Sequence, residues 1–199
     1  MEVYQQQLLQ GSPLRIPIKK IESMYSYIPS SVTSGKFDVP MSRAYTRLCT
    51  LWASFAQEPP ADGSGKNKLC NTFYTHTGSA ETFAYSLQLG TQRIPDNDAV
   101  GFGEAWIRLL QAVGISGSLS HATGITYADY ATNSFAVAVD TEKISNLAST
   151  GVNLSNTSTI FLKISGFGTQ TAHLPSRCHL IAQTDAIVEC RDTTVELFE

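Results

Sequence analysis

The segment Ser134-Phe135-Ala136-Val137-Ala138-Val139-Asp140 opens a series of short strands that runs to residue 199. β-Branched and aromatic residues fit a pleated, half-buried surface, and Gly, Pro, Asn and Asp between them mark turns. The later segments of this kind are Thr157–Ile164, His179–Gln183, Ala186–Cys190 and Thr194–Phe198. Short strands that follow one another with turns between them predict an antiparallel β-sandwich.

The first half of the chain shows the same alternation of apolar and polar residues. Leu14–Lys19 has the period of a strand with one wet face, and Met24–Ile28 continues it. Pro17 cannot donate a hydrogen bond to a ladder, so this strand is predicted to lie at a sheet edge or to carry a bulge. Further strands are expected at Lys36–Pro40, Arg47–Phe55 and Thr82–Gly90. Residues 1–12 are Gln-rich and are predicted to be a tail or linker before one domain at 13–199.

One helix interrupts the strands, at about residues 101–113. Apolar residues recur there at helical spacing from Phe102 to Val113, and Gly114 stands where a C-terminal cap is expected. Ile94–Asp98 is predicted to be a turn, and residues 117–130 a loop. A single helix inside a strand series is an insertion in an all-β fold, because a βαβ unit would alternate the two.

The composition is that of a compact domain with few charges. Of 199 residues, 42% are hydrophobic and only 16% are charged, against a typical charged share of about 25%. Solvated faces normally carry charge, so the shortfall predicts that neighbouring subunits cover much of the surface. The formal net charge of −3 gives no general attraction to nucleic acid or anionic lipid.

The cysteines and the first residues of the chain show no pattern of a disulfide, a metal site or a secretory signal. Cys49, Cys70, Cys178 and Cys190 have no C-x-x-C spacing, and their apolar contexts predict buried free thiols. The first residues lack the pattern of a secretory signal, which favours synthesis in the cytoplasm of a cell. No apolar run approaches the roughly 20 residues of a membrane span.

Candidate catalytic residues are few. His76, His121, His173 and His179 have no metal-ligand spacing, and no compact G-x-H-x-H motif of a cupin is present. Cys178 and His179 are neighbours on a predicted strand, so their side chains should point to opposite faces.

Three other motifs also have non-catalytic interpretations. Gly166–Gln170 precedes no helix and lacks the Lys of a phosphate-binding loop, so it is read as an inter-strand loop. Glu189 and Glu196 are expected on a wet strand face. The aromatic residues could stack on sugars in a lectin, but the alternation of Tyr25, Tyr27, Phe83, Tyr85 and Phe161 favours core packing. The sequence therefore predicts no enzyme, no catalytic or metal-binding residues and no cofactor.

Several segments together resemble the polinton-like and adintovirus-type major capsid proteins of the double-jelly-roll lineage. The segments that carry this resemblance are Leu87–Pro95 with Gly103–Trp106, Phe135–Lys143, Gly151–Ile160, Asp185–Glu189 and Val195–Leu197. The likeness covers residues 82–199 well. In the first eighty residues only the general strand pattern is similar. It implies a jelly roll, with Asp140–Lys143 as a turn and Gly151–Ile160 as a hairpin.

The resemblance also implies a structural role in a virion. A homotrimer that contacts neighbouring subunits and builds an icosahedral capsid is expected, with no specific binding to nucleic acid. A length of 199 residues holds one jelly roll and not two. The chain is therefore the C-terminal half of a longer capsid protein, a single-jelly-roll relative, or a host gene derived from such an element. The strand-like start favours the first.

Two other classes remain open at this stage. A non-enzymatic binding module, such as a lectin-like or TNF-like jelly roll, would share the fold and also oligomerise. A cupin-type enzyme would share the fold as well, but it would need a metal. A saturable glycan ligand would favour the first class, and stoichiometric iron, zinc or manganese the second.

Overall fold

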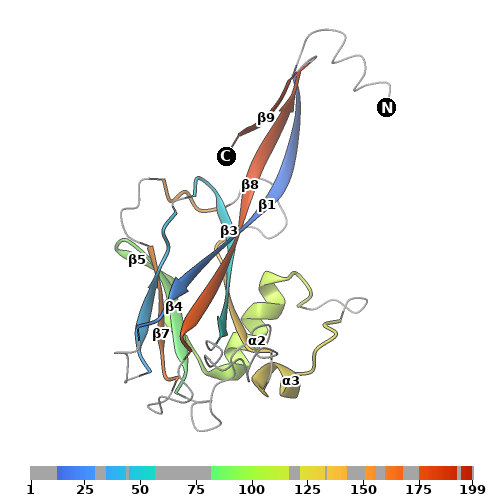
Figure 1. Ribbon diagram of the computed structural model, residues 1–199. Helices are drawn as coiled ribbons and strands as arrows, with labels where there is room; N and C mark the ends of the chain where they lie inside the picture. The colour runs from blue at the N-terminus through green and yellow to red at the C-terminus, as the bar shows by residue number, and fades with distance from the viewer. Residues whose placement is uncertain are drawn as a thin grey trace, which may run out of the picture.

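Two antiparallel β-sheets packed face to face form the body of the protein (Figure 1). The computed structural model describes residues 13–29, 35–43, 45–56, 82–116, 122–132, 134–142, 151–155, 160–167, 175–191 and 194–198. The predicted tail at 1–12 and Cys70 lie outside these residues.

The first sheet has the strand order β1-β8-β3-β6, and β9 pairs with one end of β8. Its strands are β1 Leu14–Tyr27, β3 Leu48–Ala56, β6 Ala136–Asp140, β8 Arg177–Cys190 and β9 Val195–Phe198. The second sheet has the order β2-β7-β4-β5. Its strands are β2 Phe37–Pro40, β4 Ala84–Leu89, β5 Gln92–Val100 and β7 Ile160–Ser165.

The strand pairs are nested along the chain. β1 pairs with β8, β2 with β7, β3 with β6 and β4 with β5, all antiparallel. The two halves of the chain therefore run beside each other, and successive pairs alternate between the two sheets. This is the topology of a jelly roll, so the predicted all-β jelly-roll sandwich is confirmed.

Aromatic rings fill the space between the sheets. Phe55 of β3 and Phe167 after β7 meet edge to face with centroids 4.9 Å apart, and Phe83 and Phe135 do so at 5.0 Å. All four side chains are fully buried. Edge-to-face packing is favourable because the positive rim of one ring faces the negative face of the other. These rings hold together strands that come from distant parts of the sequence.

The predicted inserted helix is confirmed as α2, Gly101–Ala112. Phe102 and Ala105 are buried on its inner side, and Gly114 follows it with a φ of 78°. Glu104 in the first turn reaches back and accepts a hydrogen bond from the backbone N–H of the N-cap residue Val100 at 2.8 Å. Residues of α2 contact β6 more than any other strand, so the helix lies along that side of the sandwich.

Two predictions of irregular structure need correction. A second short helix, α3 Tyr127–Thr132, lies partly in the stretch predicted to be a loop. Its Tyr130 ring packs against Trp106 of α2 with a centroid distance of 4.7 Å, and this tertiary contact favours the helix. Residues 94–98 belong to β5 instead of a separate turn, although its pairing with β4 shifts register there.

The predicted hairpin at 151–160 is also wrong in its described part. Val152 forms an isolated bridge with Leu48, and the backbone N–H of Leu154 donates to the carbonyl oxygen of Tyr45 at 2.7 Å. This segment therefore pairs with the residues that precede and begin β3, and not with itself. Residues 156–159 lie outside the described part of the chain.

The predicted strands at 179–183 and 186–190 are one strand, the 14-residue β8. It pairs with the equally long β1 in an unbroken register from Leu14 opposite Cys190 to Tyr27 opposite Arg177. β1 forms one edge of its sheet, which confirms the edge position inferred from Pro17. The outer ends of β1 and β8 extend beyond the sandwich, together with β9 (Figure 1).

Core packing is confirmed for Phe83 and Tyr85 but is wrong for Tyr25 and Tyr27. These two tyrosines are 63% and 60% exposed, and Phe161 is half-buried. Alternation places Tyr25 and Tyr27 on one face, as predicted, but Met24 on the other face is the residue that packs against the core. The period of two separates the faces and does not say which face is covered.

Candidate functional site

The reactive residues singled out in the sequence are scattered in the structure. Cys178 is buried in the core, whereas its neighbour His179 lies on the opposite face with its ring centroid 6.4 Å from that of Tyr25. The expectation that the two side chains cannot meet is therefore confirmed. His76, His121 and His173 lie outside the described residues.

The thiols in the described part of the chain are free, as predicted. Cys49 and Cys178 are buried, and Cys190 is half-buried. Burial raises the pKa of each of the Cys49 and Cys178 thiols to about 12. Both are therefore protonated at neutral pH, and a protonated thiol is a poor nucleophile and a poor metal ligand.

The surroundings of Gly166 and Glu189 indicate structural roles for both residues. Gly166 follows β7 with a φ of 83°, and the next residue, Phe167, enters the core. Residues 168–170, the rest of the predicted inter-strand loop, lie outside the described residues. Glu189 is 4% exposed, so the expectation of a wet face is wrong for this residue. It accepts hydrogen bonds from Arg191 and Arg15, which lower the pKa of its carboxyl group. Glu196 lies opposite Glu189 in the ladder and is exposed.

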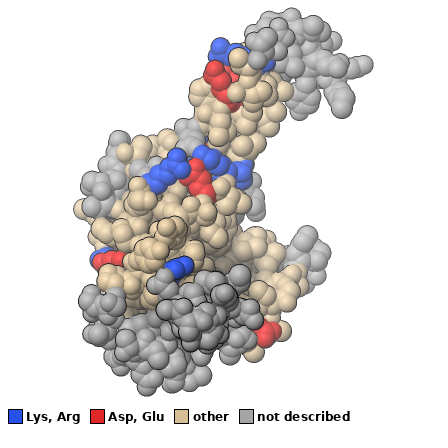
Figure 2. Space-filling model, in the orientation of Figure 1, with Lys and Arg blue, Asp and Glu red and all other residues tan. Residues whose placement is uncertain are grey.

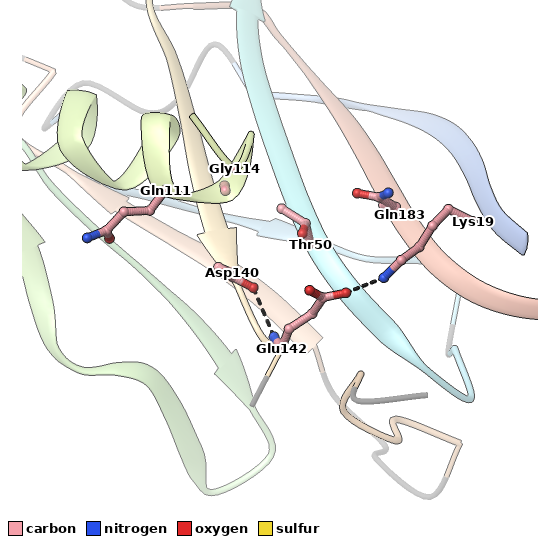
Figure 3. Close-up of a pocket in the computed structure, with 8 residues that line it drawn as sticks. Lys19, Thr50, Gln111, Gly114, Asp140, Glu142 and Gln183 are labelled. Atoms are coloured by element: carbon pink, nitrogen blue, oxygen red, sulfur yellow. Dashed lines mark hydrogen bonds and ion pairs between the residues drawn. The ribbon is translucent and has the colours of Figure 1, made fainter. Parts of the chain in front are cut away.

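The densest group of ionisable side chains was not anticipated from the sequence. Lys19 of β1 lies opposite Asp185 of β8, and its Nζ is 3.1 Å from Oδ1 of that residue. The same ammonium group donates to Sγ of Cys49 at 3.3 Å and pairs closely with Glu142, which follows β6. Figure 3 shows the Glu142 carboxylate pointing at Lys19. We call Lys19, Cys49, Glu142 and Asp185 the lysine cluster.

The lysine cluster includes three potential metal ligands. The ligand atoms of Cys49, Glu142 and Asp185 all lie within 4.8 Å of one another. The Lys19 ammonium, however, is already the cation among them. Burial opposes its charge, but hydrogen bonds to Glu142 and Asp185 outweigh burial and raise the pKa of Lys19. The geometry fits an internal ion pair that ties β1, β3, β8 and the end of β6 together.

Sequence reasoning could not have found the lysine cluster, because its members are far apart in the chain. Lys19 and Cys49 are separated by 30 residues, and Lys19 and Glu142 by 123. Cys49 enters the cluster at a register irregularity of β3, between Leu48 and Thr50. A bulge re-aims a side chain, and no motif in the sequence announces this one.

A small polar cavity adjoins the lysine cluster. Its volume is about 40 Å³, and it lies between the C-terminal end of α2 and the first sheet. Gln111, Thr50 and Asp140 contribute to its wall (Figure 3). A cavity of this size holds two or three water molecules at most, so it is too small for an organic substrate.

Replacement of Asp140 by Asn is expected to stabilise the protein at neutral pH. Burial raises the pKa of Asp140, so the ionised carboxylate is less favourable in the folded state than in the unfolded state. The protein therefore loses stability as the pH rises above the ordinary value of 3.8, and it regains this stability at lower pH. Asn keeps the oxygen that accepts the Glu142 backbone N–H at 2.9 Å. Urea unfolding should show a gain of up to about 1 kcal/mol at pH 7.

The gain for D140N should disappear below pH 4, where the aspartate itself is protonated. The exposed Asp38 of β2 provides the control, because D38N should change stability little at either pH. A D140N protein that is less stable than the unaltered chain at pH 7 would mean that the negative charge of Asp140 is needed.

The fold is a jelly-roll β-sandwich, and solved structures of viral capsid proteins share it. The chain is similar to the VP54 protein of PBCV-1, whose crystal structure was fitted into a cryo-EM reconstruction of the virophage Sputnik. That match has a TM-score of 0.60 and 12% sequence identity, and it covers 98% of this chain and 53% of VP54. A chain of the PBCV-1 virus capsid, in a quasi-atomic model, matches with a TM-score of 0.59 and 12% identity over 98% of this chain and 54% of its own.

The chain thus spans about half the length of these solved structures. No protein-family model matches it, and no curated protein matches it in sequence. Among the described residues, no helix is both long and apolar enough to cross a membrane.

Proposed function

We propose that this protein is a structural subunit of a viral capsid, which assembles with copies of itself through lateral contacts into an icosahedral shell. The observation that carries the proposal is the fold match, which extends over 98% of the chain to a protein of the PBCV-1 capsid. A shell subunit needs a rigid sandwich and broad, moderately polar sides. The low charged fraction of 16% supports such sides.

The described side chains also support a role without catalysis. Cys49 and Cys178 are protonated thiols, Lys19 is held as an ammonium ion by two carboxylates, and His179 stands beside Tyr25. A nucleophile next to a base, which acyl or phosphoryl transfer requires, is not formed by these groups. The ionisable groups serve to hold strands together.

The finer features of the proposal follow from the resemblance described above. Residues 13–199 form one jelly roll, residues 1–12 a tail or linker, and three copies form a trimer that contacts neighbouring trimers in the virion. The net charge of −3 favours contacts between subunits over specific binding to nucleic acid.

Self-association of the purified chain tests the proposed function. Size-exclusion chromatography with light scattering should give a mass of three subunits or a multiple of it, and negative-stain microscopy should show uniform particles. Reversal on dilution distinguishes assembly from aggregation. A strictly monomeric protein at high micromolar concentration would contradict the proposal.

A glycan-binding module is the second candidate, and one observation favours it. Tyr25 and Tyr27 are exposed on the outer face of β1, their ring centroids are 5.5 Å apart, and the guanidinium group of Arg177 lies 5.5 Å from the centroid of Tyr27. Exposed rings beside a cation can stack on sugars. A glycan array with a saturable ligand whose binding is lost in Y25A would support this candidate, and an array without a ligand would exclude it.

A further inference from the structure

Part of the first sheet extends beyond the sandwich as a three-stranded ribbon. We use the term ribbon for residues 14–18 of β1, residues 186–190 of β8 and the strand β9. β3 pairs with β8 only up to Thr184, and β9 takes that side of β8 from Ile187 onward. In the part of the chain that the structure describes, no second sheet lies against the ribbon, and Figure 1 shows the ribbon standing away from the body.

The ribbon has one face made of apolar side chains. Directly opposed residues of antiparallel strands share a face, and alternate residues along a strand do so too. By this rule Ile16 of β1, Val188 of β8 and Leu197 of β9 lie side by side on one face. We define the apolar face of the ribbon as Leu14, Ile16, Ile18, Val188, Val195 and Leu197. Ile16 is 42% exposed, Leu197 49% and Val195 72%.

The opposite face of the ribbon carries its charges. Glu189 Oε2 accepts a hydrogen bond from Arg15 Nε at 2.9 Å, and its Oε1 is 2.7 Å from a terminal nitrogen of Arg191. Glu196 lies opposite Glu189 on the same face. One face of the ribbon is therefore free of charged side chains, whereas the other combines these charges with the apolar side chains of Pro17, Ile187 and Phe198. Figure 2 shows charges at the tip of the ribbon and at its base, with uncharged surface between them.

A polar cluster separates the apolar face from the core. On the same face, β8 continues into the core residues Ala182 and Leu180, whereas β1 continues through Lys20 and Glu22. Lys20 pairs with Glu22 at 2.5 Å, and Arg43 pairs with Glu22 at 2.6 Å. The core thus ends at a set of ion pairs, and the apolar face beyond them is a separate surface and not an extension of the core.

We propose that the apolar face of the ribbon packs against the same face of a second copy of this chain. A face without charged members needs a partner surface without charged members, because an unpaired charge buried there would be costly. The apolar face meets this requirement itself, and two copies bring no like charges together. Two such faces would stack like the sheets of a sandwich, about 10 Å apart.

Two other exposed apolar side chains, Ile107 and Tyr27, are less suited to be the partner. Ile107 on α2 is next to Arg108, which pairs with Glu104. Tyr27 lies under the guanidinium group of Arg177. Each would place a charge against the apolar face, whereas a second ribbon would not.

The size of the face predicts how strong this contact is. Five residues along three strands cover roughly 17 Å by 14 Å, or on the order of 240 Å² for each copy. A stable dimer buries about 1,200–2,000 Å² in total. The ribbon contact is therefore weak in isolation and suits a shell, in which every subunit makes several contacts at once. In this respect the inference rests on the proposed function and specifies one of its surfaces.

Two neighbouring residues of β9 provide the test, because they lie on opposite faces of the ribbon and are similarly exposed. Leu197 is on the apolar face, and Phe198, which is 46% exposed, is on the other. Sedimentation equilibrium of the full chain from about 10 µM to about 1 mM measures its association. L197E should raise the dissociation constant of the pairwise ribbon contact at least about tenfold. F198E should leave it within about twofold. Circular dichroism and the melting temperature of each variant establish that it is folded.

Alkylation of Cys190 provides an independent test of the ribbon contact. Cys190 lies opposite Val195 on the apolar side of the ribbon and is half-buried. Its alkylation by a maleimide, followed by peptide mass spectrometry, should slow several-fold as the protein concentration rises, and this slowing should be lost in L197E.

Each remaining outcome contradicts a different statement. If the unaltered chain associates but L197E and F198E behave alike, or if Cys190 reacts at the same rate at all concentrations, the ribbon is not the contact and the inference fails while the proposed function stands. If the unaltered chain stays monomeric throughout, both fail.

Discussion

Substitution of Gly166 by Ala is expected to lower the free energy of unfolding by about 2 to 4 kcal/mol, of which about 1–2 kcal/mol comes from a backbone conformation that L-residues avoid. The φ of Gly166 is 83°. A Cβ atom there would also overlap the carbonyl oxygen of Thr82 and lie 2.7 Å from Cα of Phe83. Both obstacles are backbone atoms, so no side-chain rotation relieves the overlap. Urea unfolding followed by tryptophan fluorescence measures the loss.

Gly103 on α2 is the matched control for this prediction. Apart from the adjacent backbone of α2, no atom lies within 4 Å of the position that its Cβ would take, and Ala favours a helix over Gly by up to about 1 kcal/mol. G103A should therefore be neutral or stabilising. Equal stability of G166A and the unaltered chain would mean that the connection after β7 moves freely away from Thr82.

Substitution of Lys19 by Met is expected to cost about 2–3 kcal/mol at pH 7. Removal of one partner from a buried ion pair leaves uncompensated charge and typically costs about 3–5 kcal/mol, which we reduce because Lys19 is partly open to solvent. Glu142 and Asp185 are 8% and 7% exposed, so both carboxylates would lose their nearby ammonium group in a covered site. The free energy of unfolding from urea titrations measures the cost.

The pH dependence of this loss has a definite sign. The pKa of Lys19 is raised in the folded state, so its contribution to stability is complete below the ordinary lysine value of 10.5 and is lost as the pH rises through the higher folded value. The difference between K19M and the unaltered chain should thus persist from pH 6 to 10 and narrow above that range.

Arg93 of β5 supplies the comparison for K19M. It pairs with Asp98 at 3.2 Å, and the two side chains are 44% and 43% exposed, so R93M should cost about 1 kcal/mol or less. If K19M and R93M lose the same stability, the lysine cluster is no stronger than an exposed ion pair.

Local pattern was sufficient to predict most strands and α2. The alternation of Phe83, Tyr85, Leu87 and Leu89 placed all four on one face, and all four are buried. Pro17 indicated an edge strand, because a missing N–H affects the ladder at that position. These predictions succeeded because neighbouring residues carry the information: a period of two or 3.6 is visible in a few residues.

The same pattern failed wherever the answer depended on which face is covered. Leu14–Lys19 was predicted to have one wet face, yet both of its faces are exposed at the outer end of β1. Tyr25 and Tyr27 alternate like core residues and lie outside the core. Alternation separates two faces, but the position of the second sheet decides which of them is buried.

The sequence by itself determined an all-β sandwich with one inserted helix, free thiols at Cys49 and Cys178, and the separation of Cys178 from His179. The tertiary structure alone decided the nested strand pairs, the meeting of Lys19 with Cys49, Glu142 and Asp185, and the exposed apolar face of the ribbon. The physical reason is the separation along the chain over which each kind of interaction acts. Periodicity and turn chemistry act between adjacent residues, whereas strand register joins residues such as Arg15 and Glu189 that are 174 positions apart.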